Sequence, residues 1–165
     1  MARELRKGAS WASEVEQEMP ELAGALAETL KAMQRVAEGL GSAPRVVIHR
    51  DFYPANLLWD GNAVWGIDFD QMALGDAAVD LGSFVSQTEK LAMREGLAAE
   101  AVADQIGGFL DAYAAHQPIE RTARLPFFRA YTLLHVASAE VRRHRDVWER
   151  LTAAFVRRAH EVISA

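Results

Sequence analysis

The chain has 165 residues, half of them apolar and a quarter charged, which is the composition of an ordinary single-domain globular protein. Its formal charge of −5 argues against nucleic acid or an anionic membrane as the main partner, and the absence of cysteine excludes disulfides and thiolate metal sites. No stretch approaches the roughly 20 apolar residues of a membrane span, and the N-terminal residues lack the apolar core of a signal peptide, so we expect a cytoplasmic protein.

The first predicted element is a long helical segment over residues 11–40, which is rich in Ala, Leu, Glu and Met. Pro20 is expected in the first turn of the main helix, where its missing N–H group costs nothing. Gly39 and Gly41 are expected to end this helix, and Pro44 prevents its continuation. Apolar residues recur at helical spacing along one face: Leu22, Leu26, Leu30, Met33 and Val36.

Residues 56–67 are typical of a β-hairpin. Asp60 and Gly61 supply a tight turn between two short runs rich in apolar residues. The two ends of a hairpin lie side by side, so Asn56 at its entry and Asp68 just after its exit are expected to be neighbours. The hairpin thereby predicts that these two side chains can share one ion.

Beyond residue 76 the sequence predicts only helices, at residues 79–94, 98–116, 125–144 and 147–163. The third of these is expected to contribute core residues: Phe127, Phe128, Tyr131, Leu134 and Val136. Trp59 and Trp65 of the hairpin are also expected to be packing residues. Four helical acids could line a pocket for a cationic substrate, although solvated helix faces explain them better: Glu89, Asp104, Asp111 and Glu140. The predicted fold class is mainly α (α+β), with a few short strands at the site, in a single domain spanning residues 1–165.

The segment after the first strand carries the clearest motif. An apolar run at residues 45–48 predicts that strand, and residues 49–51 with Asn56 then match the pattern H-R-D-x-x-x-x-N. A second apolar run ends in Asp68. Phosphoryl transfer needs this layout, because one carboxylate orients the attacking hydroxyl while an amide oxygen and another carboxylate hold magnesium against the nucleotide phosphates.

Three residues are therefore the candidates for this chemistry. Asp51 is expected to accept or orient the proton of the substrate hydroxyl; the alternative is an aspartate that caps the turn before Pro54. Asn56 offers a neutral oxygen to a magnesium ion that keeps several waters, and Asp68 offers the carboxylate. The alternatives are a loop asparagine that bonds its own backbone and a turn acid at a strand end. Because Asp51, Asn56 and Asp68 occur together at the spacing that this chemistry needs, we favour the functional interpretation of each.

Five further residues are expected to support the site. His49 is expected to pack beneath the loop and to hydrogen-bond the backbone. Arg50 could contact the adjacent aspartate, a phosphate or a neighbouring loop carboxylate. Asp70 could be a second metal contact, a substrate contact or a solvated loop acid. Asp76 and Asp80 lie near a predicted helix start, so capping of its free N–H groups is favoured, from which they could also brace the catalytic loop.

Taken together, residues 49–56, 67–70 and 75–81 resemble the aminoglycoside phosphotransferase family, which includes choline-kinase-like small-molecule kinases. Members show a histidine-x-aspartate loop with asparagine five residues after the aspartate. An isoleucine-aspartate magnesium motif and then glycine-aspartate-x-x-x-aspartate-leucine follow. All three parts occur here in the same order.

The resemblance implies a role for each motif. It makes Asp51 the catalytic base, and it makes Asn56 and Asp68 the residues that bind Mg²⁺ and, with it, ATP or GTP. The helices beyond Asp80 would help to form the pocket for a small-molecule hydroxyl substrate. The implied fold is a protein-kinase-like C-terminal lobe, helical with a small β-hairpin at the active site.

Two features depart from the family. It usually has glycine where Arg50 stands; arginine there is typical of protein kinases, but residues 68–70 lack the glycine of D-F-G, so a protein kinase is the weaker interpretation. The second departure is the absence of the N-terminal ATP-binding lobe, with its phosphate-covering loop and strand lysine. Residues 39–41 do not begin a complete G-x-G-x-x-G, Lys31 lies mid-helix, and Lys7 is expected in a frayed terminus.

The sequence therefore supports two functional hypotheses. The first is the catalytic lobe of an ATP- and magnesium-dependent phosphotransferase that phosphorylates a hydroxyl of an aminoglycoside-, choline- or sugar-like molecule. The second is a truncated, catalytically inactive lobe that acts as a binding or assembly module, with a separate N-terminal lobe or a second copy of the chain as its partner. Under either hypothesis we expect a fragment of a longer kinase or a natural truncation.

Overall fold

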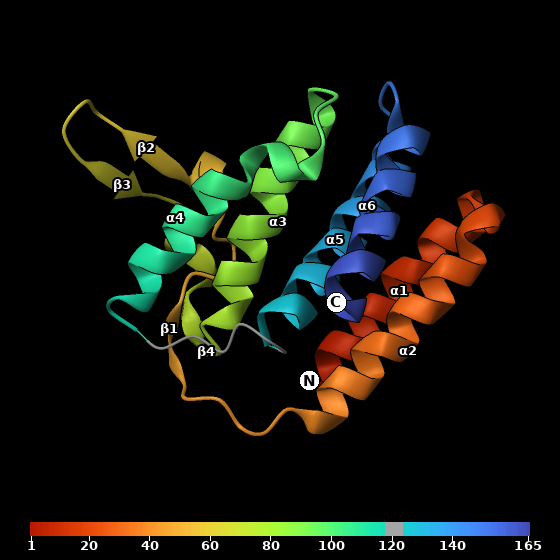
Figure 1. Ribbon diagram of the computed structural model, residues 1–165, viewed down its shortest axis with the longest axis horizontal. Helices are drawn as coiled ribbons and strands as arrows, with labels where there is room; N and C mark the ends of the chain where they lie inside the picture. The colour runs from red at the N-terminus through yellow and green to blue at the C-terminus, as the bar shows by residue number, and fades with distance from the viewer. Residues whose placement is uncertain (118–123) are drawn as a thin grey trace.

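A computed structural model describes residues 1–117 and 124–165, and most of this chain is helical (Figure 1). The long helices are α1 (Ala2–Glu18), α2 (Ala23–Gly39), α3 (Ala78–Arg94), α4 (Ala103–Ala114), α5 (Arg124–Arg143) and α6 (Trp148–Ser164). In the described part of the chain, four short 3₁₀ turns join the elements: η1 (Pro20–Leu22), η2 (Pro54–Asn56), η3 (Phe69–Gln71) and η4 (Ala99–Val102). The four helical segments predicted beyond residue 76 are confirmed to within a few residues, although residues 99–102 form the 3₁₀ turn η4 and not part of α4. The single helical segment predicted over residues 11–40 is wrong in its continuity, because α1 and α2 are separate helices and Pro20 opens the turn η1 between them.

The strands form two separate antiparallel pairs. They are β1 (Val46–Ile48), β2 (Leu57–Trp59), β3 (Val64–Gly66) and β4 (Ala73–Gly75). The predicted hairpin is the β2–β3 pair, in which Leu57 lies opposite Gly66 and Gly61 takes the positive φ of the tight turn. The β1–β4 pair is a finding that the sequence patterns did not predict, and it places Val46 opposite Gly75.

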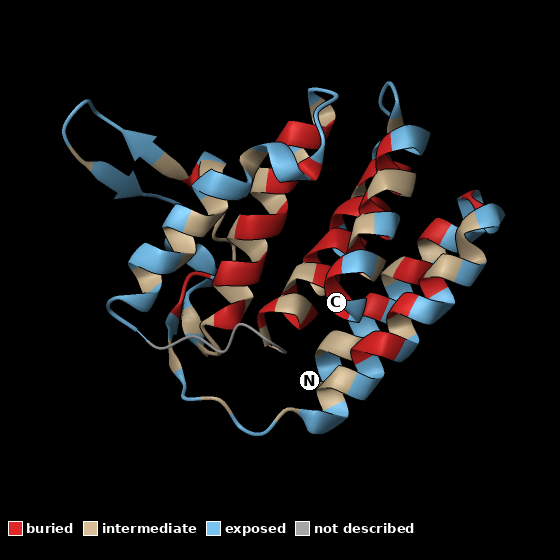
Figure 2. Cartoon of the chain, in the orientation of Figure 1, coloured by how far each residue is buried: buried red, intermediate tan, exposed pale blue. Residues whose placement is uncertain are grey.

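The core is built around α5, which packs against α1, α3 and α6. Buried residues gather on the facing sides of these helices in Figure 2, whereas the hairpin and the outer sides of α2 and α4 are exposed. Four of the five residues predicted for the core of α5 are buried, and Tyr131 is partly buried. Gly82 allows α3 to cross α5 closely, because a Cβ there would lie only 2.8 Å from the main-chain carbonyl carbon of Phe128. This crossing holds the start of α3 next to the loop that follows β1.

Three expectations about individual residues are wrong. Lys7 is not in a frayed terminus but in the middle of α1. Trp59 and Trp65 do not pack into the core; their side chains are 65% and 57% exposed on the hairpin. A two-stranded hairpin that projects from the body has no second layer to cover its apolar side chains.

Two of the four helical acids are also neither solvated nor part of a pocket for a cationic substrate. Glu89 is 2% exposed and accepts hydrogen bonds from Arg129 and Arg158. Glu140 is 1% exposed and pairs with Arg94. Buried carboxylates require such cationic partners, because an unpaired charge is strongly disfavoured away from water.

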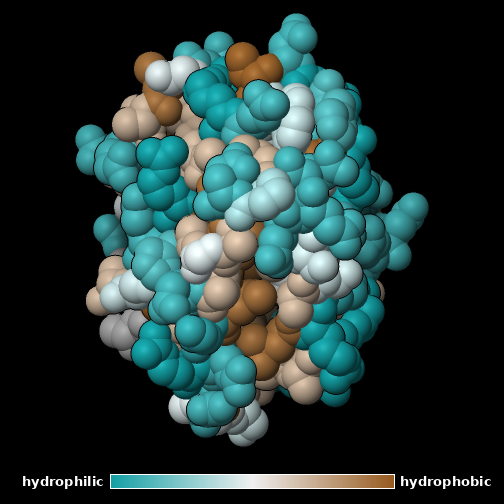
Figure 3. All heavy atoms as spheres, turned by 90° about the vertical axis from the view of Figure 1, so that its right-hand side faces the viewer, coloured by the Kyte–Doolittle hydropathy of each residue, from teal (hydrophilic) through white to brown (hydrophobic). Residues whose placement is uncertain are grey.

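The outer surface of the helical body is largely polar. Figure 3 shows the face on the right-hand side of Figure 1, where hydrophilic residues predominate around a smaller apolar patch. Within the described residues, no helix combines the length and the apolar character needed to cross a membrane.

Candidate active site

The segment after β1 is held in place by a carboxylate from α3. The main-chain nitrogens of His49 and Arg50 donate hydrogen bonds to Asp80 Oδ2 and Oδ1, at 2.6 and 2.8 Å. A carboxylate that accepts two N–H groups fixes the course of the backbone between them. The expectation that the Asp80 side chain caps α3 is therefore wrong, since it caps no N–H group of that helix and both of its oxygens bond to the loop.

The same segment has an unusual backbone conformation. Arg50 adopts a positive φ of 69°, in the left-handed region. For a residue with a Cβ this conformation costs about 1–2 kcal/mol. The guanidinium of Arg50 is exposed and forms no ion pair with the described residues, so its side chain does not offset that cost.

His49 connects the loop to the end of the hairpin. Its ring is buried, and Nε2 lies 2.9 Å from the carbonyl oxygen of Ile67. The ring also packs against Phe69, with 4.9 Å between ring centroids. His49 thus lies beneath the loop and hydrogen-bonds the backbone, which is the geometry expected from the sequence.

Asn56 is the buried neighbour of the other two candidate residues. Its Nδ2 donates to the main-chain oxygen of Asp51 at 2.8 Å, and its main-chain oxygen accepts a hydrogen bond from the Ile67 nitrogen at 3.1 Å. Because Ile67 is paired with Asn56, the next residue, Asp68, begins beside the entry of the hairpin. The structure thereby brings the main chains of all three candidate residues to one place.

Asn56 and Asp68 also have the donor atoms that a magnesium ion would need. The Asn56 amide nitrogen is used by the loop, so its Oδ1 is the atom left to act as a ligand. Asp68 is exposed, takes a left-handed conformation at φ 63°, and forms no hydrogen bond or ion pair with the described residues through its carboxylate. Magnesium typically uses one or two carboxylates together with phosphate oxygens and waters. In the described part of the chain, no three His, Cys, Asp or Glu side chains form a fuller metal-binding group.

The sequence matches a known family over most of its length. The model of the phosphotransferase enzyme family matches residues 2–119. The chain belongs to the phosphotransferase enzyme family. This membership confirms the resemblance that the three motifs indicated.

One solved structure has the same fold as this chain. It is the spectinomycin phosphotransferase APH(9)-Ia, in complex with ADP and spectinomycin, with a TM-score of 0.60 and 11% sequence identity. The match covers 100% of this chain and 55% of that chain, so this chain spans about half the length of that enzyme. No curated protein matches the sequence. The similarity confirms the predicted fold class, a mainly helical kinase-like lobe.

In this phosphotransferase family member, Asp51 lies at the wall of a cavity of about 650 Å³. The cavity extends from the loop to α1, which contributes Trp11, and to α5, which contributes His135. Neither Asn56 nor Asp68 lines it. Asp51 therefore lies between the cavity and the hairpin, with its main-chain oxygen bonded on the hairpin side.

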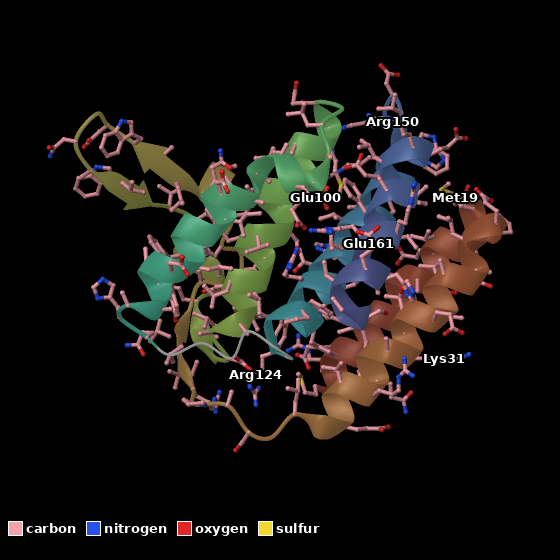
Figure 4. All side chains as sticks on the ribbon, viewed as in Figure 1. Met19, Lys31, Glu100, Arg124, Arg150 and Glu161 are labelled. Atoms are coloured by element: carbon pink, nitrogen blue, oxygen red, sulfur yellow. The ribbon has the colours of Figure 1, made fainter. Side chains whose placement is uncertain are left out.

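The first acid of the glycine-aspartate motif, Asp76, has a separate structural role. Asp76 Oδ1 accepts a hydrogen bond from the Ala78 nitrogen at 3.0 Å, which confirms capping at the start of α3. Its Oδ2 lies 2.7 Å from Nη1 of Arg124, which is labelled in Figure 4 at the start of α5. Arg124 also donates to the main-chain oxygen of Gly41. These contacts join α3, α5 and the loop before β1 around one edge of the cavity.

The pKa of the Asp80 carboxylate reflects the partial burial of this side chain. Burial raises the pKa of Asp80, and the negative charge of Asp51 raises it further. The hydrogen bonds from the His49 and Arg50 nitrogens act in the opposite direction, because they stabilise the charged carboxylate. Asp70 of η3 is exposed and forms no hydrogen bond with the described residues, which fits the solvated loop acid among its three alternatives.

Several cavity residues were not identified from the sequence. Trp11, Arg3 and Lys7 come from α1, and Arg124 comes from the start of α5. Helical periodicity over residues 2–18 could have predicted α1, but no local signal indicates that this helix faces the loop that carries Asp51.

Proposed function

We propose that this chain is the catalytic lobe of an ATP- and magnesium-dependent kinase that phosphorylates a hydroxyl group of a small molecule. The observation that carries the proposal is the position of Asp51. It lies at the wall of a cavity of about 650 Å³, and its main-chain oxygen is bonded to Asn56 at the base of the hairpin. A substrate in the cavity would thus meet a carboxylate next to the residues suited to hold the phosphoryl donor.

Each residue contributes a separate part of the reaction. Asp51 orients the substrate hydroxyl and accepts its proton as the oxygen attacks phosphorus. Asp80 keeps the loop backbone fixed, so Asp51 needs little reorganisation to reach the hydroxyl. Asn56 and Asp68 would hold magnesium through one amide oxygen and one carboxylate. When bound, the magnesium nucleotide supplies the phosphoryl group and neutralises its charge.

Calorimetry with magnesium and ATP or GTP tests the nucleotide half of this proposal. We expect magnesium-dependent nucleotide binding by the chain, and its loss in Asp68→Ala. Asp104→Ala is the matched control, because that acid is exposed on α4 and does not line the cavity around Asp51. Binding that survives Asp68→Ala, or that does not need magnesium, would contradict the assignment of Asp68.

Turnover tests the catalytic role of Asp51. In an assay of ADP formation with a transferable substrate, Asp51→Asn should lower kcat by about 10²–10⁴-fold, the range attributed to a positioned general base. The variant keeps the size of the side chain, so circular dichroism and the melting temperature should change little. Near-normal kcat in Asp51→Asn would remove the kinase assignment.

A second candidate function, a binding or assembly module, is favoured by the apolar surface of the hairpin. Leu58, Trp59, Val64 and Trp65 are each at least half exposed, at 50%, 65%, 61% and 57%. Contiguous apolar surface of this kind often marks an interface. Sedimentation velocity would then show self-association of the chain that Trp59→Ser weakens. Leu97→Ser, a matched change at an exposed apolar residue after α3, should leave it unchanged.

A further inference from the structure

The cavity beside Asp51 has an aromatic wall. The Trp11 ring lies 4.8 Å from the Tyr131 ring and 4.6 Å from the His135 ring, measured between centroids. All three side chains line the cavity, and they join α1 to α5 across from the catalytic loop. An aromatic surface of this size suits the apolar face of a ring-shaped molecule.

The charged groups of the cavity are unequal in number. Among the described residues, five basic side chains line it: Arg3, Lys7, Arg45, Arg50 and Arg124. The same part of the chain contributes three acidic side chains: Glu4, Asp51 and Asp76. The ion pair between Asp76 and Arg124 neutralises one charge of each sign. The described side chains that remain carry an excess of positive charge, in a chain whose formal net charge is −5.

Three of these cations are available to a ligand. Arg3, Lys7 and Arg50 form no ion pair and no side-chain hydrogen bond with the residues that the structure describes, and all three are exposed. Arg45 uses one guanidinium nitrogen to bond the Leu74 carbonyl at 3.0 Å, and no acid of the described residues pairs with its charge. An anion that entered the cavity could therefore pair with cations without breaking an existing ion pair.

The charged side chains of the cavity shift the pKa values of two residues in the aromatic wall, His135 and Tyr131. Desolvation lowers the pKa of His135 and the charges of nearby cations, including Lys7, lower it further, while Asp51 opposes them. Burial raises the pKa of Tyr131, which Arg3 and Arg50 oppose. The α1 cations and the catalytic carboxylate therefore all lie within electrostatic reach of one small volume.

A neutral acceptor completes the cavity. Gln87 of α3 lines it, and Gln87 Oε1 is buried without a hydrogen-bond partner among the described residues. A buried acceptor of this kind is stabilised by a donor such as a hydroxyl group. Asn56 and Asp68 lie outside the cavity lining, so the positive charge is separate from the side chains predicted to hold magnesium.

We propose that this cavity binds a hydroxylated, ring-shaped small molecule that carries a carboxylate or phosphate group, and that it disfavours polycationic substrates. The inference rests on the proposed function, because Asp51 is taken to act on a hydroxyl of that molecule. The cations on α1 and Arg50 would pair with the anionic group, and Trp11 would lie against the ring. A polycation of the aminoglycoside type would instead meet like charges at these positions.

Binding of three matched ring compounds tests the inference. D-glucuronate, D-glucose and D-glucosamine share their ring and differ in charge, and saturation-transfer NMR on the full chain at low salt measures the binding of each. We expect glucuronate to bind most tightly and glucosamine least. Equal binding, the reverse order, or no binding of any of the three to folded protein would overturn the proposal.

Paired variants show whether the α1 cations cause the preference. In Arg3→Gln/Lys7→Gln we expect glucuronate binding to weaken by about fivefold, with little change for glucose. Lys31→Gln/Arg35→Gln removes the same charge from exposed positions on α2 outside the cavity, where Lys31 is labelled in Figure 4, and should leave binding unchanged. Equal effects of the two double variants would contradict a specific role for Arg3 and Lys7.

Two further measurements, competition with ADP and comparison of binding with turnover, distinguish this inference from nucleotide binding by the same cations and from the proposed kinase function. ADP with magnesium should not displace glucuronate; displacement would assign the cations to nucleotide phosphates and overturn the proposal. Binding is measured without turnover, so an anion preference in a chain without phosphoryl transfer would remove the kinase function alone. A transfer-competent protein that prefers glucosamine would remove the substrate class alone.

Discussion

Asp80 Oδ2 lies 2.6 Å from the main-chain nitrogen of His49, although the two residues are 31 positions apart in the chain. With the second bond to Arg50, this carboxylate determines where the loop leaves β1. The position of Asp51 therefore depends on the packing of α3 as well as on the loop itself. Helix α3 in turn crosses α5 closely at Gly82, so the candidate catalytic residue is coupled to the core.

Replacing Asp80, whose carboxylate holds the loop after β1, should destabilise the fold and disturb the candidate site. Asp80→Asn keeps one acceptor oxygen but presents an NH₂ group to the second N–H, which leaves one main-chain donor unpaired. We expect a loss of about 1–3 kcal/mol in the free energy of unfolding, measured by urea denaturation. Asp104→Asn, at an exposed position on α4, should change it by less than about 0.5 kcal/mol. Equal stabilities of the two variants would show that the loop does not depend on Asp80.

The left-handed conformation of Arg50 predicts a stabilising substitution. Glycine adopts a φ of 69° without strain, so Arg50→Gly should raise the free energy of unfolding by about 1 kcal/mol. Arg50→Ala is the matched control, because it removes the same side chain and keeps the Cβ that causes the strain. Thermal and urea denaturation of both variants check the difference. A glycine variant no more stable than the alanine variant would show that the loop is unstrained at this residue.

Two acids that pair with Arg158 should contribute very differently to stability, because Glu89 is buried and Glu100 is exposed. Glu89 is 2% exposed and lies 2.6 Å from Arg129 and 2.8 Å from Arg158. Glu89→Ala would leave two partly buried cations without this partner and should cost about 3–5 kcal/mol in the free energy of unfolding. Glu100 also pairs with Arg158, at 3.1 Å, but is 67% exposed, and it is labelled in Figure 4 beside α3.

The exposed ion pair between Glu100 and Arg158 should contribute far less to the free energy of unfolding. Glu100→Ala should change the free energy of unfolding by less than about 1 kcal/mol, because solvent screens exposed ion pairs. Urea denaturation of the two alanine variants measures both values in the same way. Similar losses in the two would mean that burial does not set the strength of this network.

The partly buried lysine Lys90 predicts how stability changes with pH. Burial and the charge of Arg94 lower the pKa of Lys90 from 10.5 to about 8. Below about pH 8 both the native and the unfolded chain keep the proton, so the cost of burying the charge is fully present. Between about pH 8 and 10.5 the native state releases its proton first, and the stability of the native state rises with pH.

Lys90→Met should therefore be more stable than the unchanged chain near neutral pH, by about 1 kcal/mol or more. The difference should shrink as the pH rises from about 8 towards about 10. Urea denaturation across this range measures it, and Lys31→Met, at an exposed position on α2, should show no comparable trend. A difference that stays constant with pH would mean that Lys90 keeps its ordinary pKa.

The helices, the hairpin and the main motifs could be predicted from the sequence, because each depends on residues close together in the chain. Apolar spacing indicated α3, α5 and α6, and the Asp60-Gly61 turn indicated the β2–β3 pair. The hairpin in turn placed Asn56 and Asp68 together, since its length alone determines which residues meet at its base. The family resemblance also depended on residues 49–81 alone.

Contacts between distant segments could only be decided by the tertiary structure. Asp80 and Asp76 are both acids near a helix start, but the packing of α3 directs Asp80 to the loop that carries Asp51 and Asp76 to a helix cap and Arg124. The same acidic pattern was compatible with either role. Burial likewise separated Glu89 from exposed acids on the same helical surfaces, because α5 and α6 supply its cations. The cavity combines α1, α3, α5 and the loop, so its positive charge follows from the way these helices pack and not from any one segment of the sequence.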